Sequence, residues 1–177
     1  MSKNFKILSF DPASKKNVGW SIVSFVQTEK DFQLNAVNGG TFVTNHIEPW
    51  QTLWPVFQFA DSVINFHKPD YIVMEKTSSF SGGFVTGQVS NCMGAILAAC
   101  GKHNSKVSFV FPTHVKKVVT GKGKATKTMM KRSVSSFVLK YLNITLKLDS
   151  DHAYDALGNI ICWLTDSGYL VGENNET

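Results

Sequence analysis

The sequence predicts an α/β fold in which helices cover both faces of a mixed β-sheet. Three consecutive segments have the alternation and the β-branched or aromatic content of strands, and helical and strand-like segments alternate after them. A meander followed by such alternation is typical of layered proteins with a mixed sheet. The chain has 177 residues, of which 43% are hydrophobic, enough for one domain with a substantial core. We expect that domain over residues 1–171 and a flexible polar tail over residues 172–177.

The predicted elements follow one another without a linker. Strand-like segments at residues 5–10, 18–26 and 32–43 form an antiparallel meander. Apolar residues then recur at helical spacing over residues 48–67, and Pro69 ends that helix. The remaining elements are a strand at 71–75, a helix at 87–100, a strand at 107–111, a helix at 126–141 and a helix at 151–166. The sheet is therefore predicted to contain five strands, three from the meander and two further ones.

Charge is distributed unevenly along the chain. No acidic residue occurs between Glu75 and Asp149, whereas those 73 positions contain twelve lysines and arginines. The rest of the chain contains six basic and thirteen acidic residues, so the formal net charge of +5 conceals a strongly basic middle. Lys and Arg attract a polyanion regardless of its sequence, whereas carboxylates repel it unless a divalent cation lies between them. The pattern predicts a phosphate-binding surface beside a metal-binding pocket.

Candidate metal ligands come from three separate segments. Asp11 follows the first predicted strand and Glu75 follows the fourth, so the two carboxylates converge if those strands are neighbours. Asp151 and His152 precede Asp155 by four and three residues in the last helix, a spacing that places pairs of these groups on one helix face. Asp155 also lies within an apolar stripe, where an unpaired carboxylate is costly to bury. Such a group needs a partner, and a metal ion qualifies.

Structural roles compete with this interpretation. A carboxylate after a strand is often a turn residue or a helix cap. Asp149, Ser150 and Asp151 are all candidates for the N-cap of the last helix, and we expect Asp151 to be the cap; Thr126 is the candidate for the helix before it. A single histidine such as His152 is more often an ordinary surface or core residue. If the cluster is functional, two Mg²⁺ or Mn²⁺ ions about 3.5–4 Å apart suit it, because such a pair activates water and stabilises the leaving 3′ oxygen in phosphodiester hydrolysis.

The basic segment over residues 115–127 is predicted to be a DNA-contacting loop. Gly121 and Gly123 permit positive φ and a close backbone approach to phosphate, while Lys122 and Lys124 add positive charge. A merely solvated basic loop is the alternative. The absence of acidic residues nearby favours contact with nucleic acid.

These motifs resemble a known family, the RuvC-type Holliday junction resolvases of the RNase H-like superfamily. The resemblance covers nearly the whole chain, in the family's order and spacing. Its parts are Phe10-Asp11-Pro12-Ala13-Ser14, Val18-Gly19-Trp20, residues 69–75, residues 115–127 and His152-Ala153-Tyr154-Asp155-Ala156-Leu157. It implies an RNase H-like fold, and it places the family's catalytic metal ligands on Asp11, Glu75, His152 and Asp155. The family commonly has Asp where this chain has His152, which leaves open whether His152 binds metal or moves a proton, with Asp151 as a possible substitute.

The resemblance also implies roles for basic and aromatic residues. Lys116 and Lys127 match family lysines near the scissile phosphate. By this resemblance, Lys127 is expected to be a catalytic residue. In the family an aromatic residue just after the catalytic Glu stacks on unpaired bases. The matching position here is Ser78, so Phe80 or Phe84 is expected to take over that role unless both rings pack into the core. Outer contacts to the DNA backbone are expected from Lys117, Lys122, Lys124, Lys131 and Arg132.

Small residues in the helix at 87–100 allow another helix to approach closely. They are Gly94, Ala95, Ala98 and Ala99. By resemblance, this region takes part in a two-fold homodimer, which presents two sites for two symmetric cuts. Core packing within one subunit is the alternative.

Cysteines and the N-terminal residues indicate the cellular compartment. Cys92, Cys100 and Cys162 are far apart and form no CxxC pair, so we expect buried free thiols and neither a disulfide framework nor a zinc knuckle. The first ten residues are too poor in apolar side chains for a secretory leader. A cytoplasmic location in a bacterial or viral host cell is expected, with an organelle as the alternative.

The expected function is metal-dependent cleavage of DNA four-way junctions by paired symmetric nicks, with a metal-activated water and two Mg²⁺ or Mn²⁺ ions per site. Branched DNA is the expected partner, with a homodimer as the active form and a helicase as a possible further partner. One alternative is a broader nuclease of the same superfamily that acts on forks, flaps or RNA/DNA hybrids. Another is a branched-DNA binding protein with a vestigial site.

Overall fold

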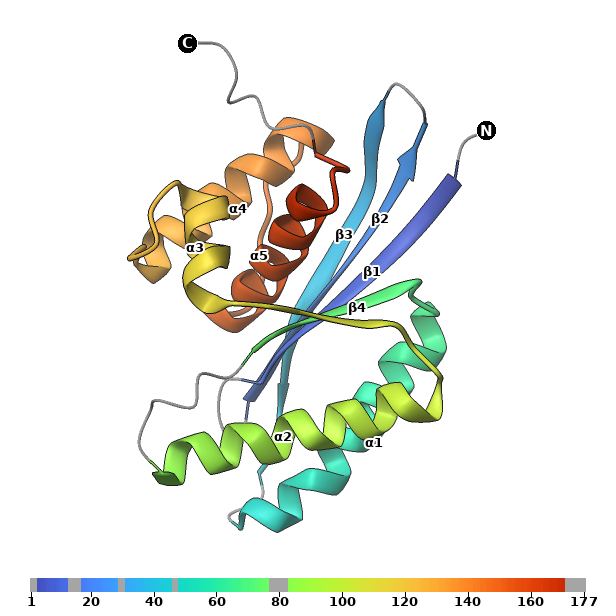
Figure 1. Cartoon of the computed structure of the whole chain (residues 1–177), viewed down its shortest axis with the longest axis vertical. Coiled ribbons are helices and arrows are strands. Elements are labelled where there is room, and N and C mark those ends of the chain that lie inside the picture. The colour runs from blue at the N-terminus through green and yellow to red at the C-terminus, as the bar shows by residue number, and fades with distance from the viewer. Residues whose placement is uncertain (1–2, 13–16, 29–30, 46–47, 77–82, 171–177) are drawn as a thin grey trace.

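A five-stranded mixed sheet forms the centre of the molecule, with strand order β3-β2-β1-β4-β5 (Figure 1). The computed structural model describes residues 3–12, 17–28, 31–45, 48–76 and 83–170. The strands are β1 (Lys3–Pro12), β2 (Asn17–Gln27), β3 (Phe32–Val43), β4 (Tyr71–Glu75) and β5 (Val107–Val110). Antiparallel pairing joins β1, β2 and β3, whereas β4 and β5 pair in parallel beyond β1. The predicted meander and the two further strands are thus confirmed.

Five helices flank the sheet within the described part of the chain. They are α1 (Pro49–His67), α2 (Gly83–Lys102), α3 (Pro112–Thr120), α4 (Lys127–Leu142) and α5 (Asp151–Asp166). Figure 1 shows α1 and α2 on one face of the sheet and α3, α4 and α5 on the other. Because β-strand side chains alternate between faces, the strands divide their apolar residues between two cores.

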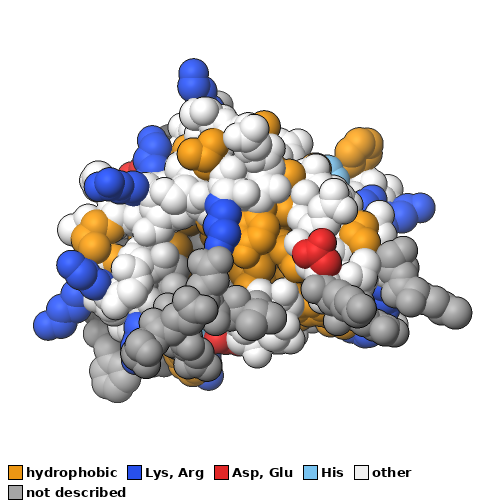
Figure 2. Space-filling view, turned by 90° about the horizontal axis from the view of Figure 1, so that it is seen from above, with side chains coloured by type: hydrophobic (Ala, Val, Ile, Leu, Met, Phe, Trp, Pro, Cys, Tyr) orange, Lys and Arg blue, Asp and Glu red, His pale blue; other side chains and the backbone are white. Residues whose placement is uncertain are grey.

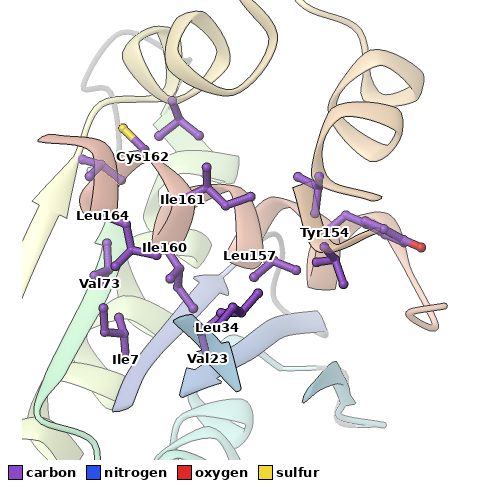
Figure 3. Packing of buried hydrophobic residues seen from close by; sticks show 14 of the residues in the cluster. Ile7, Val23, Leu34, Val73, Tyr154, Leu157, Ile160, Ile161, Cys162 and Leu164 are labelled. Atoms are coloured by element: carbon purple, nitrogen blue, oxygen red, sulfur yellow. The ribbon is translucent and has the colours of Figure 1, made fainter. Parts of the chain in front are cut away.

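One core lies between the sheet and the helices of the α5 side. Ile7, Val23 and Val73 point from three strands toward Leu157 and Ile160 of α5 (Figure 3). The other core joins α1 and α2 to the opposite strand faces, where the largest fully buried side chains are Leu8, Phe10, Ile72, Met74 and Ile96. Each fully buried side chain of this size contributes about 1.5–3 kcal/mol to folding. These cores fix the sheet on which the candidate ligands stand.

The pairing of β1 with β4 is the feature that matters most for the site. Phe10 is the register partner of Met74, so Asp11 and Glu75 are the next residues along two adjacent parallel strands. The predicted convergence of these two strand ends is therefore confirmed. Glu75 in turn pairs with Val110 of β5, directly before α3 begins.

Helix α3 corrects the predicted loop over residues 115–127. Residues 115–120 are helical, and only the residues between α3 and α4 form a loop. The helix begins at Pro112, whose fixed φ suits a first helical position, and it ends at Gly121, whose φ of 75° provides the left-handed cap. Both glycines, Gly121 and Gly123, permit a positive φ, but of the two only Gly121 adopts one. Val115, Val118 and Val119 had the helical spacing, but the short segment and its lysines obscured the signal.

The remaining observations concern the cysteines, the hydrophobicity of the helices, and predictions that fall outside the described residues. All three cysteines are free and buried, as predicted. No helix among the described residues is both long enough and apolar enough to cross a bilayer. Phe80 and the tail at 172–177 lie outside the described residues, as does the side chain of Phe84, so their predicted roles stay predictions.

Candidate active site

A cavity of about 150 Å³ opens at the ends of β1 and β4, between the sheet and the helices α3, α4 and α5. It combines carboxylates, lysines and apolar side chains. Its lining residues are Asp11, Glu75, Pro112, Val115, Lys116, Ala125, Lys127, Met130 and Asp155. Three predicted ligands and both lysines expected near the scissile phosphate therefore line one cavity.

The fourth predicted ligand stands beside this cavity. One ligand atom each from Asp11, His152 and Asp155 lies within 4.8 Å of the others, close enough for a single ion to contact all three. His152 Nδ1 is 3.2 Å from Asp11 Oδ2, within hydrogen-bonding distance. Glu75 lines the cavity from β4 but lies outside this compact group. The arrangement offers oxygen ligands from two strand ends and one helix, with an imidazole at the edge.

Burial and mutual repulsion perturb the carboxylates of the site. Burial, followed by the negative charges of Asp11 and Asp155, raises the pKa of Glu75 to about 7, although Lys116 partly offsets this. Burial and the charge of Asp11 raise the pKa of Asp155 to about 6. The hydrogen bond with Asp11 raises the pKa of His152. The nearby positive charges only partly offset burial and mutual repulsion, and a divalent cation would stabilise the charged form of these carboxylates further.

The two lysines of the cavity come from different helices. Lys116 lies in α3 and its charge acts on Glu75, whereas Lys127 is the first residue of α4 and its charge acts on Asp155. Lys127 Nζ also lies 3.8 Å from Asp151 Oδ2. Each lysine can therefore contact an anion that enters between the carboxylates and the solvent.

The other predicted basic contacts lie outside the cavity. Lys117, Lys122, Lys124, Lys131 and Arg132 are all exposed. Lys122 and Lys124 stand in the loop between α3 and α4, and Lys131 Nζ lies 5.0 Å from the ring centre of Tyr154. Figure 2, seen from above, shows basic side chains projecting along the edge of the molecule where α3 and α4 lie in Figure 1.

The N-cap of α5 is Ser150, so the prediction that Asp151 caps this helix is wrong. Ser150 Oγ accepts a hydrogen bond from the backbone N–H of Ala153 at 3.3 Å. Asp151 is the first helical residue, and its carboxylate turns to Lys127 instead. Asp149 accepts hydrogen bonds from the backbone and the hydroxyl of Thr41. The cap prediction for Thr126 is correct, since its hydroxyl accepts from the N–H of Met129 at 3.3 Å.

Residues of β2 hold the first turn of α5 against the sheet, a role that the sequence analysis did not identify. The Ser21 hydroxyl donates to the carbonyl oxygen of Ala153 at 2.8 Å. Gly19 lies so close to His152 that an added Cβ would stand 2.6 Å from the Cβ of His152. Gly19 belongs to the Val18-Gly19-Trp20 motif, but the motif alone does not indicate that the backbone of His152 packs against this glycine. This close approach places His152 and Asp155 beside β1.

Comparison with known proteins agrees with this fold. Residues 7–163 match the family described as crossover junction endodeoxyribonuclease RuvC. The protein of that name from Oleidesulfovibrio alaskensis is 28% identical over 163 residues, which is 92% of each chain. A RuvC structure from Thermus thermophilus superposes with a TM-score of 0.70 at 17% identity, covering 92% of this chain and 96% of that one.

A second Thermus thermophilus RuvC structure, determined in complex with a Holliday junction substrate, also has a TM-score of 0.70. It is 18% identical and covers 89% of this chain and 92% of that one. The predicted RNase H-like fold is thereby confirmed. Because the family match extends over most of the sequence, this chain belongs to the RuvC family of crossover junction endodeoxyribonucleases.

Proposed function

We propose that this protein resolves DNA four-way junctions by paired symmetric nicks, hydrolysing one phosphodiester at each of two sites. The observation that carries the proposal is the meeting of Asp11, Glu75 and Asp155 with Lys116 and Lys127 around one cavity. Carboxylates alone would repel a DNA phosphate, and lysines alone would only bind it. Together with a divalent ion they suit phosphodiester hydrolysis that leaves 5′ phosphates and 3′ hydroxyls.

The donor set fits Mg²⁺ or Mn²⁺. Hard divalent cations prefer carboxylate oxygens, and burial together with neighbouring carboxylates raises the pKa values of Glu75 and Asp155 despite the nearby lysines. Asp11, Glu75, Asp155 and His152 would hold the ions, two per site. When bound, the ions supply the Lewis acidity that activates the attacking water and stabilises the leaving 3′ oxygen.

The chain's own residues position the substrate. Lys116 and Lys127 would contact the non-bridging oxygens of the scissile phosphate as it approaches the carboxylates. The hydrogen bond between His152 and Asp11 holds the imidazole at the edge of the cluster. From there His152 serves either as a ligand or as a proton acceptor for the attacking water. The exposed basic residues beyond the cavity, named above, would follow the DNA backbone and add affinity without base specificity.

A two-fold homodimer is the proposed active form. Ala95 and Ala99 of α2 are buried, so packing within one subunit accounts for their small size. Gly94 and Ala98 are exposed, and packing within the subunit does not account for them. An added Cβ on Gly94 would meet nothing within 4 Å. The exposed side of α2 is therefore open to a second helix at short distance. A dimer through this surface presents two sites to one junction.

The test is cleavage of an end-labelled four-way junction, with a linear duplex, a fork, a flap and an RNA/DNA hybrid of matched sequence alongside. Each substrate is incubated with Mg²⁺, with Mn²⁺ and with EDTA. Paired symmetric nicks in the junction alone, abolished by EDTA, support the proposal. Cleavage of the other substrates at equal rates would instead indicate a broader structure-specific nuclease. Tight junction binding without cleavage in either metal would indicate a binding protein with a vestigial site.

A further inference from the structure

A second cluster of potential metal ligands lies where α3 meets the C-terminal end of α5. His114 comes from α3, and Cys162 and Asp166 come from α5. One donor atom from each lies within 4.8 Å of the others. None of the three lines the catalytic cavity, so the cluster is separate from the site described above.

The distances from Asp166 to the other two donor atoms are close to those in a tetrahedral zinc site. Zn–S bonds of about 2.3 Å and Zn–N or Zn–O bonds of about 2.0–2.2 Å place sulfur and oxygen about 3.6 Å apart and nitrogen and oxygen about 3.3 Å apart at tetrahedral angles. Here Cys162 Sγ is 3.6 Å from Asp166 Oδ2. His114 Nε2 is 3.0 Å from both carboxylate oxygens of Asp166. Only small movements would admit an ion between them.

Exposure differs across the cluster in a way that suits an ion entering from solvent. Cys162 is fully buried, whereas the His114 and Asp166 side chains are 46% and 45% exposed. Figure 3 shows the Cys162 side chain on the side of α5 that faces away from Ile7 and Val23. Cys162 and Asp166 are four residues apart and share one helix face. The cluster thus has a thiol on its inner side, two ligands at the surface and an outward position for water.

We propose that His114, Cys162 and Asp166 bind a zinc-like divalent transition metal ion that links α3 to α5. A thiolate and an imidazole favour such an ion over Mg²⁺, which prefers oxygen ligands. Binding forms one bond each to sulfur, nitrogen and oxygen and releases the thiol proton to solvent, with no change in oxidation state. Burial and the Asp166 carboxylate raise the pKa of the Cys162 thiol to about 12, so the metal-free thiol keeps its proton and donates a hydrogen bond to Asp166.

The proposed metal site lies on the same two helices, α3 and α5, that carry residues of the catalytic cavity. His114 precedes Lys116 by two residues in α3, and α5 also carries Asp155. An ion that joins these helices would hold the lysine and the carboxylate at a fixed separation. The competing explanation is an ion pair between His114 and Asp166 with the thiol as a hydrogen-bond donor, which needs no metal.

Cobalt titration of the full-length protein distinguishes the two explanations. Co²⁺ is added in the presence of excess Mg²⁺, and thiolate-to-metal charge-transfer absorption is recorded, because the described lining of the catalytic cavity contains no cysteine. We expect a band that saturates at one equivalent of Co²⁺ and disappears on addition of Zn²⁺. Cys162→Ser should abolish the band, and Cys100→Ser, which changes a buried thiol in the other core, should retain it.

His114→Ala provides a variant that keeps the core intact, because His114 is exposed. It should weaken Co²⁺ binding at least about tenfold and reduce the rise in melting temperature that Zn²⁺ gives the unmodified protein in the presence of excess Mg²⁺. The absence of a charge-transfer band in the unmodified protein would overturn the proposal. A band that survives Cys162→Ser, or an equal Zn²⁺-dependent rise in melting temperature in His114→Ala, would overturn it as well.

Discussion

Asp155 connects the chemistry of the site to the core of the molecule. It follows the buried Tyr154 and precedes the buried Ala156, yet its carboxylate reaches the catalytic cavity. We predict that Asp155→Asn abolishes junction cleavage and preserves junction binding, because it removes an anionic ligand and leaves the basic surface unchanged. Cleavage of labelled junctions and gel-shift titration measure the two properties on the same preparation.

Asp151→Asn is the matched control for this change. Asp151 lies one helical turn earlier, is exposed, and contacts Lys127 rather than the compact ligand group. It should retain most of the cleavage activity. Loss of cleavage in Asp151→Asn with activity retained in Asp155→Asn would reverse the ligand assignment. Equal loss of binding and cleavage in Asp155→Asn would contradict its role as a ligand.

Glu75 makes the stability of the metal-free protein depend on pH. Its pKa is raised from 4.5 to about 7, first by burial. A carboxyl group whose folded pKa exceeds its unfolded value binds more protons in the folded state, so stability falls as pH rises between the two values. Glu75→Gln should therefore stabilise the metal-free protein at pH 8, by about 1–3 kcal/mol, and have little effect at pH 4.

Urea denaturation in EDTA at both pH values measures this difference, and Asp31→Asn, outside the site, is the control. An equal effect of Glu75→Gln at pH 4 and pH 8 would exclude titration as the cause. Addition of Mg²⁺ should reduce the advantage of Glu75→Gln at pH 8, because the ion stabilises only a charged carboxylate.

At the scale of elements, the contact of β2 with α5 determines where the last two ligands stand. Gly19→Ala introduces a Cβ that overlaps the backbone carbonyl group of His152, and neither backbone can yield without shifting the first turn of α5. We predict a loss of about 1–3 kcal/mol in the free energy of unfolding, together with a fall in kcat under conditions where the variant is fully folded. Chemical denaturation and single-turnover cleavage measure the two effects.

Ser21→Ala tests the same contact without overlap. It removes the hydrogen bond to Ala153 and should cost about 0.5–1.5 kcal/mol, with a smaller effect on cleavage. A Gly19→Ala variant that is as stable and as active as the unmodified protein would contradict the prediction, because it would show that the first turn of α5 can move away from β2 at no cost.

The loop between α3 and α4 is predicted to contact DNA phosphates. Lys122→Ala combined with Lys124→Ala should weaken junction binding and reduce the slope of log K against log salt by about 1.8, if each lysine neutralises one phosphate. Lys68→Ala combined with Lys106→Ala removes the same charge from exposed positions directly after α1 and directly before β5, away from the cavity lining. Titrations over a range of salt concentrations compare the two variants, and equal slopes in both would place Lys122 and Lys124 away from the DNA.

Sequence periodicity predicted most elements because each had a clear signal. The meander strands alternate, and α1 and α5 have well-spaced apolar residues. Helix α3 was missed because Val115, Val118 and Val119 span little more than one turn among lysines. The cap of α5 was assigned to Asp151 because three adjacent residues have capping side chains, and only backbone geometry separates Ser150 from its neighbours.

For the whole molecule, we predict that α2 forms the dimer interface. Gly94→Arg should yield monomers in analytical ultracentrifugation, because the exposed surface around Gly94 admits another helix only where side chains are small. The monomer should nick junctions singly, without coordinated cuts on opposing strands. Lys102→Ala is a control on the same helix, at its last residue. A Gly94→Arg protein with the sedimentation coefficient of the unmodified protein would contradict the interface.

The candidate catalytic site was more predictable than the second cluster for a physical reason. Asp11 and Glu75 end strands, and their neighbours carry a family pattern, so the sequence contains both the positions and the context. His114 and Cys162 are 48 residues apart in the chain and belong to no short motif. Only the packing of α3 against α5 brings them together. The contact of Gly19 with His152 likewise depends on a helix-to-strand distance that no local pattern encodes.

The carboxylate cluster draws on both ends of the described chain, Asp11 from β1 and Asp155 from α5. During synthesis, the N-terminal strands and α1 emerge from the ribosome long before α5 is made. A partly synthesised or truncated chain that lacks α5 holds Asp11 and Glu75 but has neither His152 nor Asp155. Such a fragment cannot assemble the proposed nuclease centre even if its sheet forms. Assembly of the proposed nuclease centre is therefore linked to completion of the fold.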